Sequence, residues 1–140
     1  MENLHASAVE LDGKAVLIKG TSGSGKSLLA LKLISLGANL IADDQTLVFK
    51  YNNKVCLCAP ASLPSGLEIR GIGIVGAPVC KQAELRLVVD VSKVEKNRFP
   101  EATERKIVIM GYSFPFYLFK DIKEPAASIY AILKFGILSL

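Results

Sequence analysis

The chain has 140 residues, of which 51% are hydrophobic and 21% are charged, and its net charge is +4. This length and composition fit a single folded domain over residues 1–140 and exclude a disordered chain. The modest positive charge is scattered, and basic residues do not interleave with aromatic ones, so we expect no nucleic-acid binding.

No feature of the sequence predicts export or membrane insertion. Residues 1–14 lack the basic segment and apolar run that are typical of a signal peptide. The apolar segment 126–140 is interrupted by Lys134 and is too short to span a bilayer. Three cysteines, at positions 56, 58 and 80, form neither an even disulfide set nor a zinc quartet. The sequence therefore predicts a cytoplasmic protein with reduced thiols and no membrane contact.

The pattern of residues 1–37 predicts two strands followed by a helix. Strands are expected near residues 6–11 and 14–19, joined by Asp12-Gly13, a pair typical of a two-residue hairpin turn. A Gly/Ser-rich stretch follows, and the next residues form an apolar helix that ends at Gly37. Because this helix is apolar on most of its surface, we expect it to be well buried.

The rest of the chain is rich in predicted strands. They cover residues 39–44, 46–51 and 54–59, with a hairpin turn at Asn52-Asn53, and continue at 84–92, 106–111 and 114–119. Residues 67–76 look like a strand interrupted by glycines, which indicates bends or a close backbone approach. A charged loop covers 96–105, and a last helix runs from Pro125 to about Phe135. The predicted fold class is α/β, a P-loop core on a mixed, strand-rich sheet with few helices.

Residues 20–27, GTSGSGKS, match the spacing G-x-x-x-x-G-K-[ST] of a phosphate-binding loop. The glycines permit backbone conformations that aim successive N–H groups at phosphate oxygens, and the following helix adds the positive end of its dipole. A strand before the loop and a helix after it are the required context. We therefore predict nucleotide binding by Gly20, Thr21, Ser22, Gly23, Ser24, Gly25, Lys26 and Ser27, with Lys26 on the terminal phosphates and the Ser27 hydroxyl on Mg²⁺.

Two adjacent carboxylates, Asp43 and Asp44, follow the strand predicted after the loop's helix. A strand end beside a phosphate loop is where metal-binding carboxylates usually lie. One of the pair can hold Mg²⁺ or its water shell while the other accepts a proton from an incoming hydroxyl. The chain lacks the motifs of a nucleotide switch and is too short for an ATP-driven motor, so these residues favour a small kinase.

Three stretches together resemble one family. These are residues 5–27, HASAVELDGKAVLIKGTSGSGKS, then LIADD at 40–44, and LEIRGIGI at 67–74. They are similar to the catalytic domain of HPr kinase/phosphorylase, a bifunctional bacterial enzyme whose signature LEIRGLGI the third stretch nearly repeats. The match is good over roughly residues 5–100.

The resemblance implies roles for individual residues. His5 corresponds to the active-site histidine, next to the acidic residue that handles the seryl proton. The pair Asp43 and Asp44 corresponds to the family's ADD, with Asp43 the preferred base, and Glu68 corresponds to a second Mg²⁺ ligand beside Ser27. Arg98 is the candidate for the loop arginine of the phosphorylase reaction, since an arginine fork holds two phosphoryl oxygens at once. Arg105 is a nearby alternative, and Arg70 lies inside the signature with a structural or a catalytic role.

The resemblance also implies partners and cofactors. The chain is similar to the short, alphaproteobacterial form of the family, which is the catalytic core alone. The expected reaction is phosphorylation by ATP and Mg²⁺ of a serine on HPr or its nitrogen-system paralogue, with or without the reverse, phosphate-dependent dephosphorylation. The resemblance leaves homo-oligomerisation open, because the long forms of the family are hexamers whereas this chain is similar to the short form. Two alternatives remain, a nucleotide-responsive regulatory module without catalysis and a P-loop kinase of another small substrate.

Overall fold

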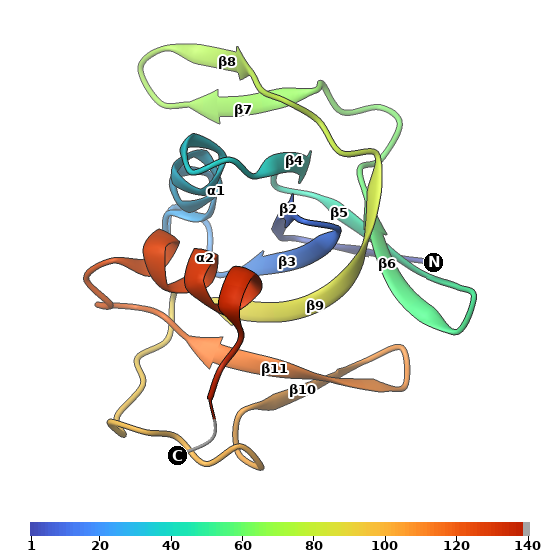
Figure 1. The fold of residues 1–140 in the computed structure, drawn as a ribbon. Helices are drawn as coiled ribbons and strands as arrows, with labels where there is room; N and C mark the ends of the chain where they lie inside the picture. Colours follow the sequence, from blue (N-terminus) through green and yellow to red (C-terminus); the bar gives the residue numbers. More distant parts are fainter. Residues whose placement is uncertain (139–140) are drawn as a thin grey trace.

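The structure, a computed structural model, describes residues 1–138 and contains a nine-stranded mixed sheet, a two-stranded sheet and two helices (Figure 1). The large sheet comprises β1 (Glu2–Leu4), β2 (Ser7–Leu11), β3 (Lys14–Lys19), β4 (Asn39–Ala42), β5 (Thr46–Tyr51), β6 (Lys54–Cys58), β9 (Gln82–Asp90), β10 (Lys106–Ile109) and β11 (Tyr112–Leu118). The small sheet comprises β7 (Gly66–Ile69) and β8 (Gly73–Gly76), and the helices are α1 (Lys26–Ser35) and α2 (Pro125–Phe135). The predicted α/β, strand-rich fold is confirmed.

Both predicted hairpin turns are present. Asp12 and Gly13 have φ of 53° and 80°, and Asn52 and Asn53 have φ of 51° and 60°. Two consecutive left-handed residues form the turn that matches the right-handed twist of the flanking strands. These turns set the registers of β2 with β3 and of β5 with β6.

Two features of the large sheet were not predicted. β1 pairs with β5 over three residues, although its sequence has no strand pattern. Met110 and Gly111, with φ of 52° and 86°, form a third hairpin turn that joins β10 to β11. Their segments were predicted as two separate extended pieces, because Met-Gly is not a typical turn pair.

Three parallel strands end at the same edge of the sheet. β9 pairs in parallel with β3 on one side, and with β11 on the other side over its last residues. Asp90 at the end of β9 lies opposite both Lys19 of β3 and Leu118 of β11. Ligands of open α/β sheets bind outside the carboxyl ends of such strands, so this edge is where a site is expected.

The core lies on both faces of the central strands. In β3, Val16 and Ile18 face the helices while Ala15 and Leu17 face the opposite cluster, and all four are fully buried. This explains why β3 reads as a continuous apolar run rather than an alternating one. α1 and α2 cover the same face of β3 and β9, as Figure 1 shows.

The helix α1 is only partly buried, so the prediction of a well-buried helix was wrong. Leu29, Ala30 and Leu33 face the sheet, whereas the side chains of Leu28 and Leu36 are 60% and 45% exposed. The sheet, α2 and β7 contact α1, and Leu28 and Leu36 lie outside the core cluster that these elements form. The predicted end is confirmed, since Gly37 takes a φ of 111° directly after the last turn.

The glycine-interrupted run at 67–76 forms the hairpin β7–β8. Gly71 and Gly73 have φ of 85° and 126° and make the predicted bend between the strands. The close backbone approach falls on Gly66 instead, where an added Cβ would lie 2.5 Å from the carbonyl oxygen of Val75. The hairpin lies beyond α1, away from the large sheet (Figure 1).

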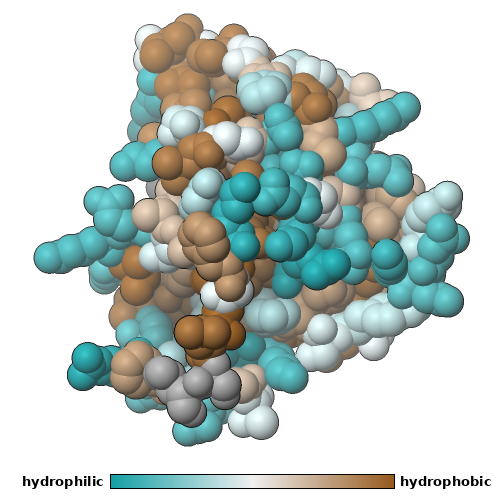
Figure 2. Space-filling view, in the orientation of Figure 1, coloured by the Kyte–Doolittle hydropathy of each residue, from teal (hydrophilic) through white to brown (hydrophobic). Residues whose placement is uncertain are grey.

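The hairpin carries exposed apolar side chains. Ile72 is 76% exposed and Ile74 is 61% exposed. Figure 2 shows apolar surface gathered at the upper end of the molecule, where Figure 1 places β7 and β8.

The helix α2 has the predicted bounds and begins at Pro125. Its buried side chains, Ala126, Ile129 and Leu133, join the core formed by α1 and the sheet. Within residues 1–138, neither helix is long and apolar enough to cross a membrane. The three cysteines, all in this part of the chain, are free.

Replacement of Ile129 by alanine tests the contribution of α2 to the core. Ile129 is fully buried, so we expect Ile129→Ala to lower the free energy of unfolding by about 3 kcal/mol through lost burial and the cavity left behind. Urea unfolding measures the change. Phe135→Ala, at a residue of the same helix that is 78% exposed, is the control and should change stability by less than about 0.5 kcal/mol. Equal effects would contradict the docking of α2.

Candidate active site

The phosphate loop, residues 20–27, joins the end of β3 to the first turn of α1. Gly23 and Gly25 have φ of 78° and 103°, which L-residues with side chains rarely adopt. A Cβ added at either glycine would meet nothing within 4 Å, so the space beside the loop is open. Backbone N–H groups and the N-terminus of α1 therefore face a space that suits an anion.

The side chain of Lys26 lies along this loop. It is only 6% exposed, and its Nζ donates hydrogen bonds to the carbonyl oxygens of Gly20 at 3.0 Å and Thr21 at 3.1 Å. The loop carbonyls thus hold a buried ammonium group next to the open space. A compact cation in this place suits the terminal phosphates of a nucleotide.

The carboxylate of Asp43 connects three elements. Its Oδ1 accepts hydrogen bonds from Ser7 Oγ at 2.9 Å and Ser27 Oγ at 2.7 Å, and its Oδ2 accepts one from the backbone N–H of Glu68 at 3.3 Å. Ser7 lies on β2, Ser27 on α1 and Glu68 on β7. Sequence reasoning missed Ser7, and no motif marks it, because its role depends on β2 pairing with β4.

Asp44 and His5 form a separate, exposed pair. His5 Nδ1 lies 3.4 Å from Asp44 Oδ1, and the two side chains are 53% and 63% exposed. Asp44 adopts a left-handed φ of 68°, and its backbone N–H donates to Ser7 Oγ at 3.2 Å. This backbone turn directs the two adjacent carboxylates to different partners, as expected for neighbouring side chains at a strand end.

A cavity of about 520 Å³, here called the carboxylate-side cavity, brings several predicted residues together. Its lining includes Lys26, Ser27, Asp44 and Glu68. Arg70 lines this cavity as well. The sequence left open whether Arg70 has a structural or a catalytic role, and the structure places it beside the other predicted residues.

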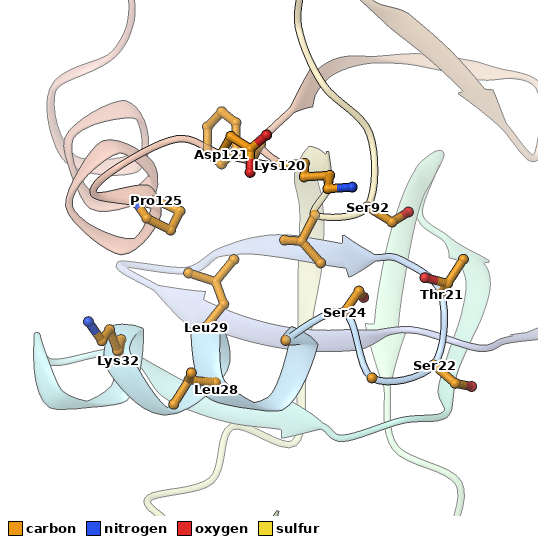
Figure 3. A pocket seen from close by; sticks show the side chains of 14 residues that line it. Thr21, Ser22, Ser24, Leu28, Leu29, Lys32, Ser92, Lys120, Asp121 and Pro125 are labelled. Atoms are coloured by element: carbon orange, nitrogen blue, oxygen red, sulfur yellow. The ribbon is translucent and has the colours of Figure 1, made fainter.

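A second cavity of about 500 Å³ lies on the other side of the phosphate loop and is here called the helix-side cavity (Figure 3). Loop and α1 residues line it on one side, and residues 91–92 and 119–121 line it on the other. Sequence reasoning missed this cavity, because the residues facing the loop lie about 70 and about 100 residues later in the chain and no motif connects them to it.

Arg98 is not brought to these residues. It lies in the exposed loop after β9, where its guanidinium stacks over the ring of Phe99 at 5.2 Å, and it lines neither cavity. Arg105, the nearby alternative, is bound by Glu95 in a two-point ion pair whose Nη2–Oε2 distance is 2.8 Å. The pair braces the base of the loop that carries Arg98.

The residues around Asp43 fit a magnesium ion. Ser27 Oγ and Asp43 Oδ1 are hard oxygen donors 2.7 Å apart, next to the phosphate loop. Within residues 1–138 no group of three or more His, Cys, Asp or Glu side chains is placed to hold a metal by itself. Mg²⁺ is usually bound in this way, by one or two protein oxygens together with substrate phosphates and water.

These features define an α/β protein of the P-loop class. The carboxylates of Asp43 and Asp44, which follow β4, lie beside the Ser27 end of its phosphate loop. The chain belongs to the HPr serine kinase C-terminal domain family, whose sequence model matches residues 1–113. It superimposes with a TM-score of 0.81 on the HPr(Ser) kinase/phosphatase structure from Coxiella burnetii, at 28% identity, covering 96% of this chain and 89% of that one.

Curated relatives carry the name HPr kinase/phosphorylase. The Mycoplasmopsis pulmonis protein is 35% identical over 102 residues, 68% of this chain and 33% of its own length. The Malacoplasma penetrans protein is 31% identical over 129 residues, 84% of this chain and 42% of its own length. This chain thus matches less than half of the length of these relatives.

Replacement of Gly20 by alanine tests the shape of the phosphate loop. An added Cβ would lie 2.8 Å from Val91 Cγ2 and would also press on Ser24, so the loop must shift. We expect Gly20→Ala to weaken the binding of inorganic tripolyphosphate roughly tenfold, as measured by calorimetric titration. Gly76→Ala is the control, because an added Cβ there meets nothing within 4 Å. Unchanged affinity in Gly20→Ala would contradict the loop geometry.

The brace between Glu95 and Arg105 predicts a pH dependence. Hydrogen bonding and the charge of Arg105 lower the pKa of Glu95 from its ordinary 4.5 to about 2. A lowered pKa means that the brace is complete above pH 4.5 and is lost as the pH falls towards 2. Carbon-detected NMR titration should show Glu95 titrating near 2 in the native protein and near its ordinary value in Arg105→Gln. Arg98→Gln is the control and should leave this pKa low, whereas an ordinary pKa of Glu95 in the native protein would exclude the brace.

Proposed function

We propose that this chain is an ATP-dependent protein kinase that phosphorylates a serine of the phosphocarrier protein HPr or its nitrogen-system paralogue. One observation carries the proposal. The hydrogen bonds of Asp43 and Ser7 hold the phosphate loop, the carboxylate pair and β7 together, with His5 beside Asp44. The family membership and the names of the relatives support the same reaction.

The phosphate loop would bind the nucleotide through its phosphates. Its backbone N–H groups and Lys26 bind the phosphates, with the terminal phosphate towards the carboxylate-side cavity. Ser27 and Asp43 would hold Mg²⁺, with Glu68 lining the same space, and the ion would neutralise charge on the transferring phosphoryl group. Catalysis then rests on positioning and electrostatics.

The contacts support Asp44, rather than Asp43, as the acceptor of the seryl proton. Both oxygens of Asp43 already accept hydrogen bonds, and Ser27 ties that carboxylate to the magnesium side of the site. Asp44 is exposed, lines the cavity that a seryl hydroxyl would enter, and has His5 at 3.4 Å to share the proton. The serine oxygen would then attack the γ-phosphorus while ADP leaves.

The same groups would serve the reverse reaction. An oxygen of inorganic phosphate would attack the phosphorus of phosphoserine, the serine oxygen would leave with a proton from Asp44, and pyrophosphate would form. Arg98 would support this step only if its loop moves, because that side chain lines neither cavity here.

The surface beside the carboxylate-side cavity suits a protein substrate. The hairpin β7–β8 supplies Glu68 and Arg70 to the cavity and exposes Ile72 and Ile74 next to them. Exposed apolar patches with polar surroundings mark protein-binding surfaces. The carrier would therefore approach over this hairpin, in the cytoplasm where such carriers act.

Transfer of the γ-phosphate to the purified carrier tests this proposal. With labelled ATP and Mg²⁺, the native chain should label the carrier but not a carrier whose target serine is replaced by alanine. We expect Lys26→Ala and Asp44→Asn each to reduce the rate at least about 100-fold, through lost phosphate binding and lost proton transfer. Asp12→Asn, a carboxylate on the β2–β3 turn, is the control with an unchanged rate.

The outcomes separate the alternatives. ATP binding without any labelled carrier would favour a regulatory module. Labelling that persists on the serine-free carrier would indicate another target. Pyrophosphate release when phosphate is added to phosphorylated carrier would establish the reverse reaction.

A further inference from the structure

The helix-side cavity has no role in the phosphoryl-transfer site described so far. It lies at the carboxyl ends of the parallel strands β9 and β11. β9 is the neighbour of β3 on the side away from β4, and β11 pairs with β9. Ser22, Gly23, Gly25 and Leu28 line both this cavity and the carboxylate-side cavity. A phosphate chain bound across the loop would thus have its terminal phosphate at the carboxylates and its other end at the helix-side cavity.

The lining of this cavity has the composition of a site for a flat, mostly apolar group. Leu29, Val91, Phe119 and Pro125 supply apolar walls. Ser92, Lys120 and Asp121 supply polar groups at one side, and Figure 3 shows them opposite Leu28 and Leu29. Small-molecule sites combine apolar walls with a few placed polar groups in this manner.

The far wall is held to the sheet by backbone hydrogen bonds. The N–H of Val91 donates to the carbonyl of Lys19 at 2.9 Å, and the N–H of Phe119 donates to the carbonyl of Asp90 at 2.8 Å. The buried Asp90 carboxylate accepts hydrogen bonds from both the N–H and the hydroxyl of Ser92, at 2.8 and 2.7 Å. The wall is therefore in place before a ligand binds, which lowers the entropic cost of binding.

We propose that the helix-side cavity binds the nucleoside part of ATP and that the Asp121 carboxylate accepts a hydrogen bond from the 6-amino group of adenine. This rests on the proposed function, which places the phosphates of ATP on the loop. Of the described residues that line the cavity, Asp121 is the one carboxylate, and it is exposed on the wall opposite α1. A carboxylate accepts but does not donate, so it selects a base with an N–H at that edge.

Titration of the full chain with three ligands tests the proposal. Inorganic tripolyphosphate reports the phosphate loop alone, ATP reports loop and base, and purine riboside triphosphate reports a base without the 6-amino group. We expect the native chain to bind ATP about tenfold more tightly than purine riboside triphosphate, the effect of one hydrogen bond to a charged group.

Asp121→Gly removes the acceptor without straining the backbone, since Asp121 has a left-handed φ of 66° that glycine adopts readily. It should weaken ATP about tenfold and leave tripolyphosphate and purine riboside triphosphate unchanged. Asp121→Asn keeps a neutral acceptor and should give an intermediate loss. Glu124→Gln is the charge-matched control, because Glu124 follows in the same segment but does not line the cavity.

The binding results distinguish failure of the cavity assignment from failure of the proposed function. If Asp121→Gly leaves ATP affinity unchanged, or weakens tripolyphosphate as much as ATP, the assignment of the cavity is overturned while the kinase proposal stands. If neither ATP nor tripolyphosphate binds the native chain, the proposed function falls and this inference falls with it.

Discussion

The carboxylate of Asp43 is the group on which the geometry of the site depends. It accepts hydrogen bonds from β2, from the first turn of α1 and from the backbone of β7, so a single side chain sets the distance between three elements. A charged acceptor makes stronger hydrogen bonds than a neutral one, which suits such a shared contact. The carboxylate of Asp44 does not share these contacts, because the left-handed turn of its backbone directs it to His5 and to the carboxylate-side cavity.

The phosphate loop divides the surface above the parallel strands into two regions with different chemistry. On the side of β4 lie the serine hydroxyls, the carboxylates and the hairpin β7–β8, which suit metal-assisted transfer to an incoming hydroxyl. On the side of β9 and β11 lie apolar walls with one carboxylate, which suit a base. This separation follows from the strand order, because β3 has an antiparallel neighbour on one side and a parallel neighbour on the other.

Local signals predicted most elements of the fold. Asp12-Gly13 and Asn52-Asn53 form the expected turns because left-handed backbone is least costly for these residue types, and Pro125 and Gly37 mark helix ends as expected. The strand β1 was missed because its pairing with β5, rather than its residue types, produces it, and the β10–β11 hairpin was missed because Met-Gly is not a typical turn pair. The exposed stripe of α1 was missed for a related reason, because a helical pattern does not say which apolar side chains another element will cover.

The sequence by itself determined the phosphate loop, the carboxylate pair and the signature around Glu68, and through them the family. These are short motifs whose chemistry depends on residue types at fixed spacing, so they can be recognised without knowledge of the fold. Only the tertiary structure decided that Ser7 completes the contacts of Asp43, that Arg98 lies away from both cavities, and that Phe119 and Asp121 stand beside a loop about 100 residues earlier in the chain. The physical reason is the pairing of β9 with β3 and β11, a long-range register that brings distant segments to one edge of the sheet.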